Sequence, residues 1–121
     1  MDKVSLIIGA SHKEDRYANM AQKALTQAGH TVIPFNPRGG VIDGLDVVTS
    51  IAEVELPVDT VTVYVRPAIL QTLLADVISL NPKRVILNPG TEDDDIASEL
   101  RAAGSEVLEA CTLVMLNTGQ Y

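Results

Sequence analysis

The sequence predicts an α/β fold, namely a doubly wound parallel sheet of about five strands in the order 3-2-1-4-5, with helices on both faces. Strand-like and helix-like segments alternate about five times along the 121 residues, and the connections between them are short. The first apolar run, at residues 4–8, is nearly unbroken, which is typical of a strand buried on both faces of a parallel sheet. At this length we expect one domain, residues 1–121, with a core of its own.

Each predicted strand is a short run that is rich in aliphatic or β-branched residues. The clearest alternation lies at residues 61–65, whereas a short edge strand is predicted within the acidic and irregular stretch 41–59. The predicted strands are residues 4–8, 31–35, 45–48, 61–65, 84–87 and 106–109.

The predicted helices follow the first, fourth and fifth of these strands. Gly29 and Gly104 are placed to end the first and the last helix, and Pro67 suits the first turn of the middle one. The segment Thr91 to Asp94 has the Ser/Thr-x-x-acid pattern that caps a helix start. Apolar residues recur at helical spacing over residues 20–28, 70–77 and 96–103, and one or two further turns are predicted at 50–55.

Composition narrows the classes of partner. The formal net charge is −7, which argues against nucleic acid and against an acidic membrane surface as a partner. Aromatic residues are too scarce for base-stacking platforms. The chain has a single cysteine, Cys111, and its first residues resemble neither a signal peptide nor a membrane span. We therefore expect a cytoplasmic protein without an internal disulfide.

The strand order places a ligand site at the carboxyl ends of the strands, where the order reverses between the first and fourth strands. The loops at that point are residues 9–16, 36–40 and 65–67. Gly9 turns the chain from the first strand toward a helix, whose unpaired N–H groups and positive dipole end favour phosphate.

Four of the nine basic residues lie in or beside these loops: Lys13, Arg16, Arg38 and Arg66. In an acidic protein this concentration suggests a ligand with several phosphates, although solvated loop charges are the alternative. The dinucleotide fingerprint G-x-G-x-x-G is present only in its first glycine, and no carboxylate ends the second strand, where NAD would need one. Arg38 stands about there instead, and it suits a ribose phosphate, as in NADP or the 3′-phospho-ADP part of coenzyme A (CoA).

These residues resemble a known family. Gly9-Ala10-Ser11 with the basic loop after it, and Ile33 to Pro37 at the end of the second strand, are similar to the CoA-binding domain family. Its members are small stand-alone bacterial proteins related to the amino-terminal domain of the succinyl-CoA synthetase α subunit. The resemblance continues through Asp59, Arg66-Pro67, Pro89-Gly90 and Cys111, so it covers most of the chain.

The resemblance implies a Rossmann-like domain that binds CoA. Residues Gly9, Ala10 and Ser11 would approach the phosphates, with the Ala10 and Ser11 N–H groups on the pyrophosphate and with charge supplied by the side chains of the basic loop and Arg38. The complete set of implied binding residues is Gly9, Ala10, Ser11, Lys13 and Arg16 at the phosphates, Asn36, Pro37 and Arg38 around the ribose and 3′-phosphate, and Val65, Arg66 and Pro67 beside the adenosine or pantetheine.

We expect a binding module for CoA or acyl-CoA, acting as a sensor or regulator, rather than an enzyme. The alternatives are a component of an NADP-dependent oxidoreductase, a CoA-ligase-like accessory subunit, and a structural subunit that has lost its ligand. No catalytic or metal-binding residues are predicted: His12 is expected to be an exposed loop histidine, Cys111 a packing residue, and Asp93 to Asp95 helix-start acids. The apolar tail, residues 113–121, would cover a sheet edge or form a homodimer.

Overall fold

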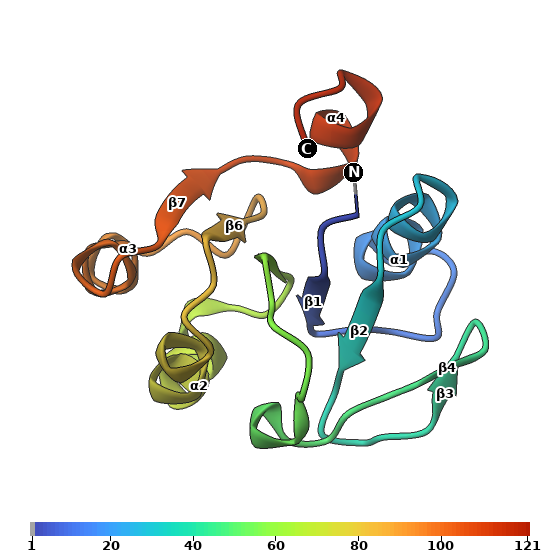
Figure 1. Ribbon diagram of the computed structural model, residues 1–121, viewed down its shortest axis with the longest axis horizontal. Helices are drawn as coiled ribbons and strands as arrows, with labels where there is room; N and C mark the ends of the chain where they lie inside the picture. The colour runs from blue at the N-terminus through green and yellow to red at the C-terminus, as the bar shows by residue number, and fades with distance from the viewer. Residues whose placement is uncertain (1) are drawn as a thin grey trace.

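The computed structural model describes residues 2–121 as a central parallel sheet with helices on both faces (Figure 1). The predicted doubly wound, Rossmann-like α/β class is confirmed. The elements are β1 (Ser5–Ile8), α1 (Tyr17–Gln27), β2 (Val32–Phe35), β3 (Val41–Ile42), β4 (Leu45–Asp46), the 3-10 helix η1 (Ile51–Glu53), β5 (Thr60–Val63), α2 (Pro67–Leu80), β6 (Arg84–Leu87), α3 (Asp94–Ala102), β7 (Glu106–Glu109) and α4 (Thr112–Asn117).

The sheet order is β2-β1-β5-β6-β7, and every neighbouring pair is parallel. The order of β2, β1, β5 and β6 therefore agrees with the prediction. Strand β7 lies beyond β6 and forms the far edge of the sheet. The expected third strand at residues 45–48 is reduced to one parallel bridge, Val48 to Phe35, although this lies on the predicted side of β2. Its first two residues instead pair antiparallel with β3 as a small separate hairpin.

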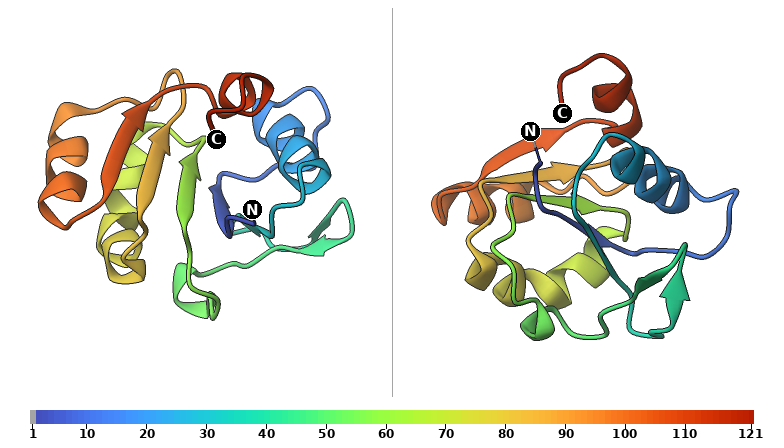
Figure 2. Two further views of the ribbon diagram at one scale, coloured as in Figure 1. Left: turned by 45° about the horizontal axis from the view of Figure 1, so that its top comes forward. Right: turned by 45° about the vertical axis from the view of Figure 1, so that its right-hand side comes forward.

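The two faces of the sheet carry separate hydrophobic clusters, because successive strand residues point to opposite sides. Leu6 and Ile8 of β1 pack in the larger cluster with residues of α2 and α3, whereas Ile7 packs in the smaller one with Leu25 of α1. Helix α4 lies against α1 on the second face. The two views in Figure 2 show α2 and α3 together on one face and α1 with α4 on the other.

One expected helix start is found, and another is corrected. Pro67 occupies the first turn of α2, as predicted, and the helix ends at Asn81 in the left-handed conformation. Helix α3 is capped by Asp93, whose carboxylate accepts the Ile96 N–H at 3.0 Å, and not by Thr91. The Thr91 hydroxyl instead donates to the Asn88 carbonyl at 2.8 Å, which closes the turn after β6.

The apolar tail folds back onto its own chain. Residues 112–117 form α4, and the Tyr121 hydroxyl lies 2.6 Å from the Ser5 hydroxyl at the amino end of the sheet. The tail therefore covers a face of the sheet beside α1, whereas a cover of one sheet edge was predicted. In the described part of the chain, no helix has the length and apolar character needed to cross a membrane.

Candidate functional site

Gly9 makes the turn that ends β1, and only glycine fits there. Its φ is +93°, and a Cβ at this position would lie 2.9 Å from Val65 Cγ1 and 3.3 Å from the Tyr64 carbonyl carbon. The loop after β5 thus approaches the backbone of Gly9 directly. This contact fixes the position of the loop that follows β1.

The loop 10–16 is tied to α1 by a hydrogen bond from Asn19, and the Ser11 N–H of this loop is free. Asn19 is buried in α1, and its amide donates to the Ser11 carbonyl at 2.9 Å. The Lys13 N–H donates to the Ser11 hydroxyl oxygen at 3.1 Å, so this hydroxyl keeps its own proton for another acceptor. Within residues 2–121 the Ser11 N–H has no hydrogen-bond partner, which leaves it available to an anion.

The Ala10 N–H differs from what the resemblance implied. It donates to the Phe35 carbonyl at 3.0 Å, as the Gly9 N–H does at 3.1 Å. The Ala10 N–H is therefore already bonded to the carboxyl end of β2. The Ala10 and Ser11 N–H groups were both expected to bind a pyrophosphate, and only the Ser11 N–H is free.

Asn36 ties the two loops together. Its amide donates to the Ala10 carbonyl at 2.9 Å, and its side-chain oxygen accepts the Arg38 N–H at 2.9 Å. This short Asx turn directs the chain after β2 around the end of β1. Asn36 thus positions Arg38 beside the Gly9 turn.

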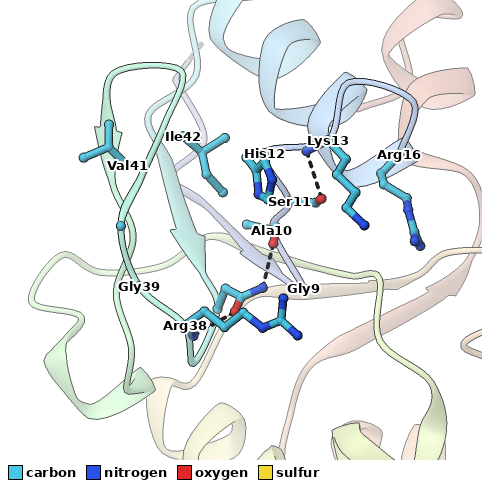
Figure 3. A pocket seen from close by; sticks show the side chains of 12 residues that line it. Gly9, Ala10, Ser11, His12, Lys13, Arg16, Arg38, Gly39, Val41 and Ile42 are labelled. Atoms are coloured by element: carbon cyan, nitrogen blue, oxygen red, sulfur yellow. Dashed lines mark hydrogen bonds between the residues drawn. The ribbon is translucent and has the colours of Figure 1, made fainter.

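These segments enclose a cavity of about 570 Å³ at the carboxyl ends of β1 and β2, here called the loop cavity. In Figure 3, Lys13 and Arg16 lie on one side, and Arg38 reaches toward the Gly9 turn from the other. Its lining includes seven of the predicted binding residues, His12, and four residues that lead into and begin the β3–β4 hairpin. The complete lining is Gly9, Ala10, Ser11, His12, Lys13, Arg16, Asn36, Arg38, Gly39, Gly40, Val41 and Ile42.

The charges around the loop cavity are unbalanced. Both ion pairs found among residues 2–121 belong to Lys23, which lies 3.9 Å from Glu14 and 3.1 Å from Asp43. The side chains of Lys13, Arg16 and Arg38 therefore have no carboxylate partner in that range, although the chain is acidic overall. Three unpaired cations around free N–H groups favour an anion with more than one charge.

Four predicted binding residues do not line the loop cavity: Pro37, Val65, Arg66 and Pro67. Val65 packs against Gly9 and the larger hydrophobic cluster, and Arg66 and Pro67 begin α2. Their place in ligand binding stays a prediction.

The sequence reasoning missed the β3–β4 hairpin as a wall of the loop cavity. Gln22 of α1 donates to the Ile42 carbonyl at 2.9 Å, and Lys23 binds Asp43, so the hairpin is fixed to α1. Gly39 and Gly40, with φ of +68° and +94°, turn the chain into it. That glycine pair was the available signal, because it marked a tight turn directly beside Arg38.

Two smaller cavities continue along the same edge of the sheet. The connecting cavity, of about 230 Å³, shares Gly9, Ser11 and Arg16 with the loop cavity. The apolar cavity, of about 380 Å³, shares Tyr17, Tyr64 and Pro89 with the connecting cavity. Asn88, Cys111, Leu113 and Val114 complete the lining of the apolar cavity.

The two polar side chains in the wall of the apolar cavity differ: the Asn88 amide is fully hydrogen-bonded, whereas the buried Tyr64 hydroxyl has no hydrogen-bond partner among residues 2–121. The buried Asn88 amide donates to the Thr62 hydroxyl and the Val63 carbonyl, both at 2.8 Å, and its oxygen accepts the Thr112 N–H at 2.9 Å. Burial raises the pKa of Tyr64 to about 12, so its phenol is neutral at ordinary pH. Cys111, expected only to pack, is half-buried in this wall.

No group of three or more His, Cys, Asp and Glu side chains in the described residues could hold a metal ion. The titratable side chains that line the loop cavity are His12, Lys13, Arg16 and Arg38. This lining can hold an anion through charge and hydrogen bonds.

Comparison with known proteins places the chain among proteins of the same fold. A crystal structure of an uncharacterized protein is 38% identical, with a TM-score of 0.95, over 100% of this chain and 99% of that one. The uncharacterized protein YneT of Bacillus subtilis is 26% identical over 84% of this chain and 76% of its own length.

A dinucleotide-forming acetyl-coenzyme A synthetase from Ca. Korarchaeum cryptofilum shares the fold at 19% identity. Its TM-score is 0.74, over 89% of this chain and 25% of the synthetase. The family described as the CoA binding domain matches residues 3–117, which is nearly the whole chain. The chain therefore belongs to the CoA-binding domain family.

Proposed function

We propose that this protein binds CoA or acyl-CoA without transforming it, with the 3′-phospho-ADP part in the loop cavity. The observation that carries the proposal is the meeting of three unpaired cations, Lys13, Arg16 and Arg38, with the free Ser11 N–H in one cavity of an acidic protein. Membership in the CoA-binding domain family supports CoA as the anion.

In this arrangement the loop around Ser11 and the side chains of Lys13 and Arg16 hold the pyrophosphate. Arg38 stands on the β2 side of the cavity, and it holds the 3′-phosphate of the ribose. A fit with CoA is supported by the free Ser11 hydroxyl proton and N–H, which can donate to phosphate oxygens.

The Arg38 assignment is tested by comparing ligands that differ in one phosphate. We expect CoA to raise the melting temperature more than dephospho-CoA, NAD or NADP does, because CoA alone has the ribose phosphate at the 3′ position. Arg38→Ala should lower CoA affinity roughly 10- to 150-fold, as expected for one hydrogen-bonded charge, and should leave dephospho-CoA affinity nearly unchanged.

Lys83→Ala is the matched control, because Lys83 is an exposed cation that precedes β6 at the opposite edge of the sheet. It makes the same change in net charge and should leave CoA binding unaltered. Equal affinities for CoA and dephospho-CoA in the wild type would remove Arg38 from this role. An NADP response larger than the CoA response would favour the alternative of an oxidoreductase component.

We extend the proposal to a sensing or regulatory role, in which the protein binds CoA or acyl-CoA and releases it unchanged. The lining of the loop cavity supplies cations and one imidazole, which suit retention of an anion. Incubation of the pure protein with acyl-CoA should return the thioester intact, and release of free CoA would refute the non-catalytic proposal. A homodimer stays a prediction, which light scattering with and without CoA would test.

A further inference from the structure

The three connected cavities change in character along the edge of the sheet. The loop cavity presents cations, the connecting cavity adds the polar residues Ser11 and Thr91, and the apolar cavity is walled by rings and aliphatic side chains. Because neighbouring cavities share lining residues, the three adjoin in a row along which an extended ligand can lie.

The apolar cavity suits a hydrocarbon better than a polar chain. The amide of Asn88 already has partners at both ends, whereas the buried Tyr64 hydroxyl has no hydrogen-bond partner among the described residues. A ligand amide placed there would lose its bonds to water and would have this one hydroxyl as a new partner, so part of its hydrogen-bonding capacity would go unmet, which is unfavourable. An alkyl chain has no such requirement.

The mouth of the apolar cavity also exposes apolar surface that the fold leaves uncovered. Tyr17 at the start of α1 is 68% exposed, and Val114 of α4 is 56% exposed. Both line the cavity. An alkyl group lying between them would remove this surface from water.

We propose that the apolar cavity binds the acyl chain of an acyl-CoA, so that the preferred ligand is a medium-chain acyl thioester rather than free CoA. This rests on the proposed function, since the phosphates must be held in the loop cavity for the chain to reach the apolar one. The order of chemistry along such a ligand, from phosphates through a diamide arm to an alkyl chain, matches the order of the three cavities.

Affinity should increase with the length of the acyl chain. Each methylene buried in the cavity is expected to tighten binding about fourfold. Calorimetry with CoA, acetyl-CoA, butyryl-CoA and octanoyl-CoA measures this series directly, and octanoyl-CoA should bind at least about tenfold more tightly than acetyl-CoA.

The single cysteine provides a second measurement. Cys111 lies in the wall of the apolar cavity, so bound octanoyl-CoA should slow its alkylation by a maleimide, whereas CoA should slow it much less. Val114→Asp should abolish the dependence on chain length and leave CoA affinity intact. Ile69→Asp is the matched control, because Ile69 is 41% exposed on α2, across the sheet.

The two proposals fail separately. Absence of CoA binding would refute the proposed function. CoA binding with equal affinities across the acyl series, or equal protection of Cys111 by CoA and octanoyl-CoA, would overturn the acyl site and leave the proposed function standing.

Discussion

The close approach of Gly9 to the loop after β5 can be measured by replacing Gly9 with alanine. An alanine Cβ would stand 2.9 Å from Val65 Cγ1 and 3.3 Å from the Tyr64 carbonyl carbon, at a φ of +93°. The positive φ costs about 1–2 kcal/mol for an L-residue. The overpacking adds roughly 1–3 kcal/mol, because the neighbour on the Tyr64 side is backbone and cannot rotate away.

Gly90 offers a matched control. Its φ is also +93°, it lies in the loop after β6, and an added Cβ would have nothing within 4 Å. Gly90→Ala should therefore show the cost of the backbone conformation alone. We expect the free energy of unfolding to fall about 1–2 kcal/mol in Gly90→Ala and about 2–5 kcal/mol in Gly9→Ala.

Urea unfolding of both variants gives these free energies, and each kcal/mol corresponds to a shift of about 3–5 °C in the melting temperature at this chain length. Adding Val65→Ala to Gly9→Ala removes the closer of the two contacts. The double-mutant cycle should therefore show a favourable coupling of about 1 kcal/mol. Equal destabilisation by Gly9→Ala and Gly90→Ala, without coupling to Val65, would show that the two loops do not meet as described.

Three further substitutions test other parts of the structure. Asn88→Ala should destabilise the fold by about 2–4 kcal/mol, since it leaves the buried Thr112 N–H without a partner, and chemical unfolding would measure the loss. Asp93→Ala should cost about 1 kcal/mol in the same assay, because it removes the cap of α3. Burial lowers the pKa of His30, and its Nδ1 accepts the Lys3 N–H at 2.9 Å, so the unfolded state takes up the proton first. The melting temperature should fall as the pH drops below about 6.5, the ordinary histidine pKa, and continue to fall through the lower folded-state pKa. His30→Asn should flatten this decline, and an unchanged pH profile in that variant would contradict the assignment.

Local signals in the sequence were sufficient for most elements of the fold. The strand at residues 106–109 and the start of α2 at Pro67 are found where they were predicted. These features depend on apolar runs and on the backbone preferences of proline and glycine, which act over a few residues. The sequence also predicted that residues after β1 and β2 would meet, because parallel strands end at the same edge of the sheet.

Other features depend on contacts between residues that are distant in the chain. The local sequence of residues 45–48 fits a strand of the main sheet and a strand of a hairpin equally well. In the structure the first two of these residues pair with β3. The Ala10 N–H is occupied by the Phe35 carbonyl, 25 positions later in the sequence, so no local pattern could show it. Asp93 caps α3 in place of the predicted Thr91, because the Thr91 hydroxyl is hydrogen-bonded within the turn after β6.

The sequence by itself determined the class of fold, the edge of the sheet at which the loop cavity lies, and three of the four cations predicted there. These follow from periodicity, turn residues and net charge, which are properties of short segments and of composition. Only the tertiary structure decided which of the predicted residues line one cavity, that the β3–β4 hairpin walls it, and that an apolar cavity beside Cys111 continues from it. A cavity is bounded by side chains from several elements at once, so its shape exists only after those elements have packed.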